Sequence, residues 1–148
     1  MKVAIANDHG GFHLKDRIIS HLHENSIDIC DLGTHNAFES ADYPDYAEKV
    51  GLSVIKKEVD LGILCCGTGI GMSIAANKIP GIRAAVVGDV FSAQRTRAHN
   101  DTNILCLGER VIGEDLALMI LDVWLNTSFE EGRHQRRVDK ISKIERAH

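Results

Sequence analysis

A cysteine stands immediately before a glycine-rich segment in the middle of the chain. An apolar run ends at Cys66, and glycines follow at Gly67, Gly69 and Gly71. Alternate glycines let the backbone approach a ligand closely and turn successive N–H groups toward an anion, and a thiol beside such donors favours its reactive thiolate form. The spacing therefore predicts an anion-binding turn with a reactive Cys66. The alternative is a tight turn that needs glycine for steric reasons, next to a structural thiol.

The anion is expected to be smaller than a nucleotide. A dinucleotide fingerprint would need glycine where Met72 stands, and the Lys-Ser/Thr pair of a P-loop is missing. The net charge of −4 argues against general nucleic-acid binding, although residues 132–148 hold six Lys or Arg against two acidic residues. A small anion fits this uneven charge better than a nucleic acid does.

Hydrophobic periodicity predicts strands that alternate with helices along the whole chain. Strands are expected at residues 2–6, 27–32, 61–66, 82–87 and 103–107, and helices at 12–22, 44–57, 72–77, 89–98 and 116–125, with a basic helix at the C-terminus. Nearly continuous apolar strands indicate a parallel sheet covered by helices on both faces. We expect an α/β, three-layer Rossmann-like fold with about five parallel strands, formed by one domain over residues 1–148.

Ligands of open parallel sheets gather at the carboxyl ends of the strands. The polar residues expected there are Asn7 to His9 after the first strand, the glycine turn after the third, and Gly108 to Arg110 after the fifth. These three loops are the expected place for chemistry.

The composition agrees with a soluble globular domain. The chain has 148 residues, of which 44% are hydrophobic and 26% charged, so collagen-like, disordered and mini-protein classes are excluded. No apolar run approaches the ~20 residues of a membrane span. The four cysteines include no C-x-x-C pair and show no metal-ligand spacing, which favours free thiols, three of them buried, in a reducing compartment. We expect a cytoplasmic protein without membrane or nucleic-acid partners.

Five motifs in order resemble the ribose-5-phosphate isomerase type B family, which shares its fold with the galactose-6-phosphate isomerase subunits. They are Asp8-His9-Gly10-Gly11-Phe12, Asp42-Tyr43-Pro44-Asp45-Tyr46-Ala47, the segment from Cys66 to Lys78, His99-Asn100-Asp101-Thr102-Asn103, and Gly132-Arg133-His134-Gln135-Arg136-Arg137-Val138. The resemblance runs essentially from end to end. It implies interconversion of ribose 5-phosphate and ribulose 5-phosphate through an enediolate, without a metal or an organic cofactor.

The resemblance also implies a role for each site residue. Cys66 matches the base that moves a proton between C1 and C2, and Thr68 matches the hydroxyl that assists it. Some family members use a glutamate at the position of Met72, which cannot accept a proton here. The backbone of Gly67, Gly69, Ile70 and Gly71 would stabilise the enediolate oxygen, Asp8 and Asn100 would bind sugar hydroxyls, and His9, Arg110, Arg133 and Arg137 would hold the phosphate.

His99 matches the residue that opens the furanose ring by proton transfer at the ring oxygen. From position alone, His99 could instead interact with the dipole at the end of a helix. Arg133 and Arg137 are four residues apart, so on a helix they share one face and can both reach one phosphate. His134 is a candidate to line the site, and Arg136 is expected on a solvated face. The family resemblance further implies a homodimer, or a tetramer of paired dimers, whose active sites are shared between subunits.

Three other functions remain open from the sequence. The substrate could be allose 6-phosphate or galactose 6-phosphate, although the intact run from His99 to Asn103 favours ribose. The chain could bind phosphosugars without catalysis. A thiol redox role for Cys65 and Cys66 is disfavoured, because vicinal cysteines strain a disulfide.

Overall fold

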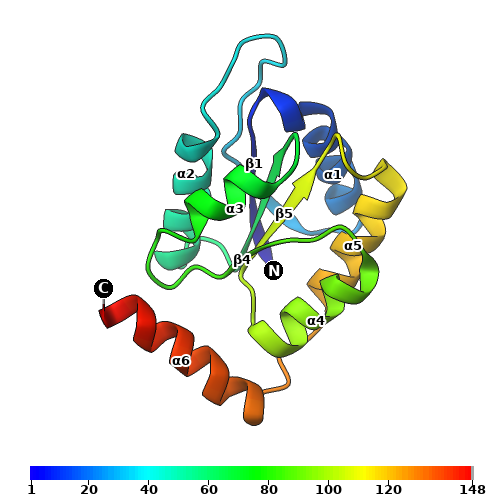
Figure 1. Ribbon diagram of the computed structural model, residues 1–148. Coiled ribbons are helices and arrows are strands. Elements are labelled where there is room, and N and C mark those ends of the chain that lie inside the picture. The colour runs from blue at the N-terminus through cyan, green and yellow to red at the C-terminus, as the bar shows by residue number, and fades with distance from the viewer. Residues whose placement is uncertain (148) are drawn as a thin grey trace.

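The computed structural model describes residues 1–147 and consists of a five-stranded parallel sheet with helices on both faces (Figure 1). The strands are β1 (Lys2–Asn7), β2 (Asp28–Asp31), β3 (Leu61–Cys66), β4 (Ala84–Val86) and β5 (Ile104–Gly108), in the order β2-β1-β3-β5-β4. The helices are η1 (His9–Gly11), α1 (Phe12–Glu24), α2 (Tyr43–Ile55), α3 (Ile70–Ala76), α4 (Val90–Asn100), α5 (Glu114–Asn126) and α6 (Arg133–Ala147). The expected three-layer α/β fold is confirmed. His148, which completes the expected domain 1–148, lies outside the described residues.

The side chains of β3 alternate between two hydrophobic cores. Ile63 and Cys65 pack with α1 and α5 on one face, while Leu64 and Cys66 pack with α2 and α3 on the other. Cys65 therefore points away from Cys66 and into the core, as expected. The buried Trp124 of α5 donates its indole N–H to Thr102 Oγ1 at 2.9 Å, which satisfies its polar atom.

Several elements differ at their ends from the predicted ranges. β4 covers three residues rather than six, because this edge strand pairs with β5 only from Ala84 to Val86. α3 begins at Ile70, two residues early, because Gly69 supplies the left-handed turn (φ 80°) that starts it. β2 is an outermost strand of the sheet, so Cys30 is half-buried where a buried thiol was expected.

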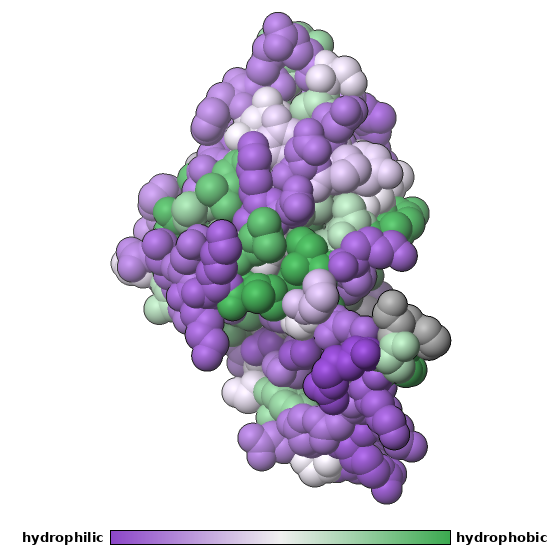
Figure 2. Space-filling model, turned by 90° about the vertical axis from the view of Figure 1, so that its left-hand side faces the viewer, coloured by the Kyte–Doolittle hydropathy of each residue, from purple (hydrophilic) through white to green (hydrophobic). Residues whose placement is uncertain are grey.

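Helix α6 lies at one end of the molecule, apart from the sheet (Figure 1). It packs against α4, near the amino ends of the strands. Figure 2 shows hydrophobic side chains gathered across the middle of one face, with mostly hydrophilic residues below them. Among residues 1–147, no helix combines the length and the apolar character needed to cross a membrane.

Gly11 allows the loop after β1 to lie directly on the end of β3. A Cβ atom added at Gly11 would overlap the carbonyl carbon and oxygen of Cys65. Both atoms belong to a buried strand backbone, so they cannot move aside easily. This contact brings the segment from Asp8 to Gly11 next to the glycine turn.

We therefore expect Gly11→Ala to lower the free energy of unfolding by about 1–3 kcal/mol, the usual cost of overpacking. Urea denaturation measures this loss. Gly88→Ala is the matched control, since a Cβ atom there meets nothing within 4 Å. Equal stability of the two variants would contradict the importance of this contact.

Candidate active site

The glycine turn between β3 and α3 is joined by hydrogen bonds to the segment after β5. The carbonyl of Cys66 accepts from the N–H of Glu109 at 2.9 Å, and that of Gly67 accepts from Arg110 at 3.1 Å. The two loops therefore form one surface at the carboxyl edge of the sheet.

The Cys66 sulfur lies within this turn. Its side chain is 5% exposed, and Sγ accepts a hydrogen bond from the N–H of Gly69 at 3.0 Å. Such a bond strengthens when the acceptor carries negative charge. Burial raises the pKa of Cys65 and of Cys106 far above the usual range, which keeps both thiols protonated. Of these three thiols, Cys66 is therefore the one whose sulfur accepts a hydrogen bond from the backbone of the loop.

Asp8 and His9 lie beside the turn. Asp8 is 7% exposed, and its Oδ1 accepts from the N–H of Gly10 at 2.8 Å. Burial raises the pKa of Asp8, and the hydrogen bond from Gly10 and the charges of His9 and Arg110 only partly oppose that rise. His9 Nδ1 accepts from the N–H of Ala41 at 3.2 Å, which tethers the loop before α2.

Thr68 and Arg110 are exposed, whereas Gly69 is buried. Thr68 Oγ1 accepts from the N–H of Ile70 at 3.2 Å. Arg110 passes alongside Gly67, where an added Cβ atom would lie 3.4 Å from the Arg110 Cδ. The structure therefore brings together at this edge Asp8, His9, Cys66, Gly67, Thr68, Gly69, Ile70, Gly71 and Arg110.

Tyr43 is a neighbour of the turn to which the sequence analysis gave no role. A Cβ atom on Gly71 would lie 2.8 Å from two atoms of the Tyr43 ring, so the phenol packs directly on the turn. Its position in the motif Asp42-Tyr43-Pro44 was the feature of the sequence that could have indicated a place at the site.

The second group of predicted residues lies at the opposite edge of the sheet in the same chain. His99 and Asn100 end α4, just before β5 begins, and Arg133 and Arg137 lie on the exposed surface of α6. β5 separates the two edges by five residues, or roughly 16 Å at about 3.3 Å per residue. A groove of about 580 Å³ lies near this second group, between α6 and the end of α4.

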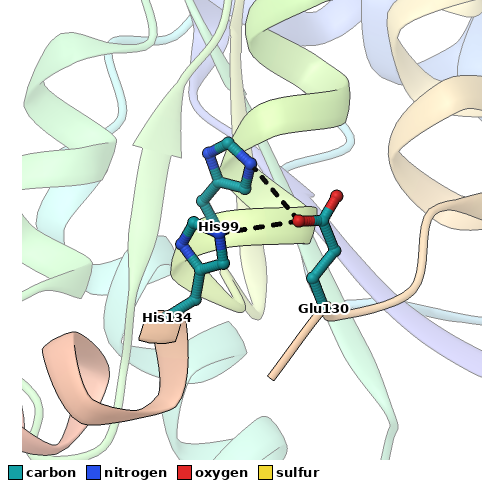
Figure 3. Close-up of side chains that lie close together, drawn as sticks. All are labelled: His99, Glu130 and His134. Carbon is teal, nitrogen blue, oxygen red and sulfur yellow. Dashed lines mark ion pairs between the residues drawn. The ribbon is translucent and has the colours of Figure 1, made fainter. Parts of the chain in front are cut away.

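His99 belongs to a cluster with His134 and Glu130 (Figure 3). The two imidazole rings stack with centroids 4.0 Å apart and planes 5° apart. Glu130 Oε2 lies 3.6 Å from His99 Nε2 and 3.5 Å from His134 Nε2. Glu130 was not predicted as a site residue. It lies four residues before His134, just ahead of α6, and this spacing was the one feature of the sequence that could have indicated the contact.

This cluster is the group among the described residues that could offer three metal ligands. The parallel rings direct their in-plane lone pairs along separate planes, so a single ion cannot lie in the plane of both. The stacked arrangement therefore suits an ion pair better than a shared metal.

Comparison with known proteins identifies the family. The model of the ribose/galactose isomerase family matches residues 3–141. Ribose-5-phosphate isomerase B of Escherichia coli (strain K12) is 54% identical over 144 residues, which cover 97% of this chain and 96% of that protein. The structure of Clostridium thermocellum ribose-5-phosphate isomerase B is 53% identical, covers 99% of both chains and has a TM-score of 0.98.

A further solved structure, of Mycoplasma genitalium ribose-5-phosphate isomerase B with bound ribulose-5-phosphate, is 42% identical with a TM-score of 0.94. It covers 99% of this chain and 97% of its own. The matched residues include the glycine turn, the end of α4 and the start of α6. By sequence and by fold, this chain belongs to the ribose/galactose isomerase family.

Proposed function

We propose that this chain is an aldose–ketose isomerase that interconverts D-ribose 5-phosphate and D-ribulose 5-phosphate. The observation that carries the proposal is the Cys66 sulfur, held at the glycine turn by the N–H of Gly69. Relatives named for this reaction, which match nearly the whole chain, support the substrate. No separate cofactor is needed, since the reaction moves only protons.

Cys66 acts as the base of the isomerisation. Its thiolate removes the C2 proton of the open-chain aldose, and O1 becomes the enediolate oxygen. A proton then passes from the O2 hydroxyl to O1, and return of the first proton to C1 gives the ketose with its carbonyl at C2. The N–H groups of Gly69 and Ile70 donate to Cys66 Sγ and Thr68 Oγ1, so the other backbone N–H groups of the turn stabilise the negative oxygen, a contribution often worth about 2.7–4 kcal/mol per donor. The exposed hydroxyl of Thr68 is available beside them to hydrogen-bond the reacting oxygens.

The second group of residues binds and opens the cyclic sugar. His99 gives a proton to the ring oxygen as the bond from C1 to that oxygen breaks, while the C1 hydroxyl loses its proton to solvent and becomes the aldehyde. Asn100 binds a sugar hydroxyl. Arg133 and Arg137 share the exposed face of α6 and bind the phosphate together with His9 and Arg110.

A homodimer would bring the Cys66 group of one chain and the His99 group of another into one site. The sheet keeps Cys66 and His99 at opposite edges of one chain, so a complete site needs the second group from another copy. Exposed apolar side chains on α2 and α3, which border the glycine turn, support such a contact. They are Leu52, Ile55, Ile70 and Ile74, which are 38–59% exposed. A tetramer would arise by pairing of these dimers.

The expected domain and compartment carry over as proposals. Residues 1–148 form one sugar-phosphate isomerase domain, supported by a family match over residues 3–141. The free thiols of all four cysteines, Cys30, Cys65, Cys66 and Cys106, support a reducing, cytoplasmic compartment.

Replacement of the base tests the reaction. Cys66→Ala should lower the kcat for ribose 5-phosphate by about 10²–10⁴-fold, the usual share of a general base. A coupled assay with ribose 5-phosphate, allose 6-phosphate and galactose 6-phosphate in parallel measures this change and the sugar preference. Cys30→Ala is the control and should keep full activity. Phosphosugar stabilisation in thermal melts without turnover by the native chain would instead favour a binding protein.

The shared site predicts complementation between two inactive chains. Cys66→Ala and His99→Asn each inactivate both sites of their own homodimer, but a mixed dimer combines one intact Cys66 with one intact His99. Random re-association of equal amounts should restore about a quarter of the native activity, because half of the dimers are mixed and each has one working site. Lack of any recovery would show that each chain forms its own site.

Asp8 predicts a dependence of stability on pH. Burial raises the native pKa of its carboxyl above the unfolded value, so ionisation favours the unfolded state, and stability falls as pH rises through these pKa values. Asp8→Asn, which still accepts from Gly10, should therefore stabilise the fold at pH 7 by on the order of 1 kcal/mol.

Urea denaturation at pH 7 and near pH 4 measures this gain, which should shrink at the lower pH. The same variant should lose activity, because the carboxylate is assigned to the sugar hydroxyls. A variant that is less stable than the native chain at pH 7 would contradict the unfavourable burial of this charge.

A further inference from the structure

Glu130, in the segment between α5 and α6, is tied directly to the helical turn that carries His99. Its backbone N–H donates to the carbonyl of Ala98 at 3.0 Å, in the last turn of α4. Its side chain then faces both stacked imidazole rings, with Oε2 3.6 Å from His99 Nε2 and 3.5 Å from His134 Nε2 (Figure 3).

The backbone around Glu130 adopts an uncommon conformation to make this arrangement. Glu131 and Gly132 both have left-handed φ angles, 56° and 53°. A non-glycine residue in this region is rare, and such strain tends to gather at functional sites. The carbonyl of Glu131 also accepts from the N–H of His134 at 2.9 Å, so the sharp turn fixes Glu130 and His134 on the same side, toward α4.

The charges around the cluster favour a division of roles between the two rings. His134 is 5% exposed, and burial first, then the neighbouring His99 and Arg133, lowers its pKa and keeps the ring neutral. His99 is 32% exposed and is the ring that a ligand can reach. The charged groups around the pair are Glu130 from the connecting segment, Arg133 and Arg137 from α6, and Arg95 from α4, whose guanidinium lies 4.0 Å from Glu130 Oε1.

We propose that Glu130 is a positioning residue for His99. Its carboxylate attracts the Nε2–H of His99 and holds the imidazole flat against His134, so that the other ring nitrogen, Nδ1, is the one that transfers a proton to the sugar ring oxygen. A base or acid oriented by a third group is a recurring arrangement in enzymes. The inference rests on the proposed function, in which His99 opens the furanose.

The substrates themselves allow a selective test. Ribose 5-phosphate is mainly a furanose and must be opened before C2 can lose its proton. Ribulose 5-phosphate stays open, because its 5-oxygen carries the phosphate and cannot close a five-membered ring. Exchange of its C1 hydrogen with solvent therefore needs Cys66 but not ring opening.

Glu130→Gln removes the charge and keeps the size of the side chain. We expect the kcat for ribose 5-phosphate to fall about tenfold, with KM changed less than twofold. Deuterium uptake from D₂O at C1 of ribulose 5-phosphate, followed by NMR, should stay within twofold of the native chain. Glu131→Gln is the matched control, and should leave both rates unchanged.

A double variant tests whether Glu130 acts through His99. If it does, Glu130→Gln added to His99→Asn should cause no further loss, because the group that it orients is already gone. Additive losses, equal loss of turnover and C1 exchange in Glu130→Gln, or turnover within twofold of the native chain would each overturn the proposal. C1 exchange that survives in Cys66→Ala would instead count against the proposed base, and the comparison of Glu130→Gln with His99→Asn would remain valid.

Discussion

A parallel sheet holds the two groups of predicted site residues at opposite edges of this protein. All five strands end at one edge, and each connecting helix returns the chain to the other. Cys66 therefore lies at the carboxyl edge, whereas His99, at the end of α4, lies at the amino edge. The strands between them are buried on both faces, so no local movement can bring the two side chains together. This separation is the physical reason for proposing that two copies complete each site.

The same sheet distinguishes cysteines that share one chemistry. Cys65 and Cys106 are enclosed by apolar side chains, and burial raises the pKa of both thiols. Cys66 is the last residue of β3, and the turn that follows supplies an N–H donor to its sulfur. The surroundings of each thiol thus depend on its position along the strand rather than on residue type.

The carboxylates of Asp8 and Glu130, at opposite edges of the sheet, differ in their burial and in their partners. Asp8 is buried, and its pKa is raised because backbone hydrogen bonds and nearby positive charges do not fully replace water. Glu130 stays half exposed, with Oε2 beside the Nε2 atoms at the edges of two stacked rings. The first arrangement is expected to lower stability at neutral pH. The second needs a strained turn at Glu131 to place the charge.

The sequence by itself determined the α/β alternation, the glycine turn after Cys66 and the common face of Arg133 and Arg137, because these depend on periodicity and spacing within one element. It also placed the loops after β1, β3 and β5 together, since parallel strands end at one edge. Only the tertiary structure placed the α4–α6 half of the site at the far edge, and only it brought Glu130 to His99. Contacts between residues distant along the chain depend on how helices pack, and local spacing carries no record of that packing.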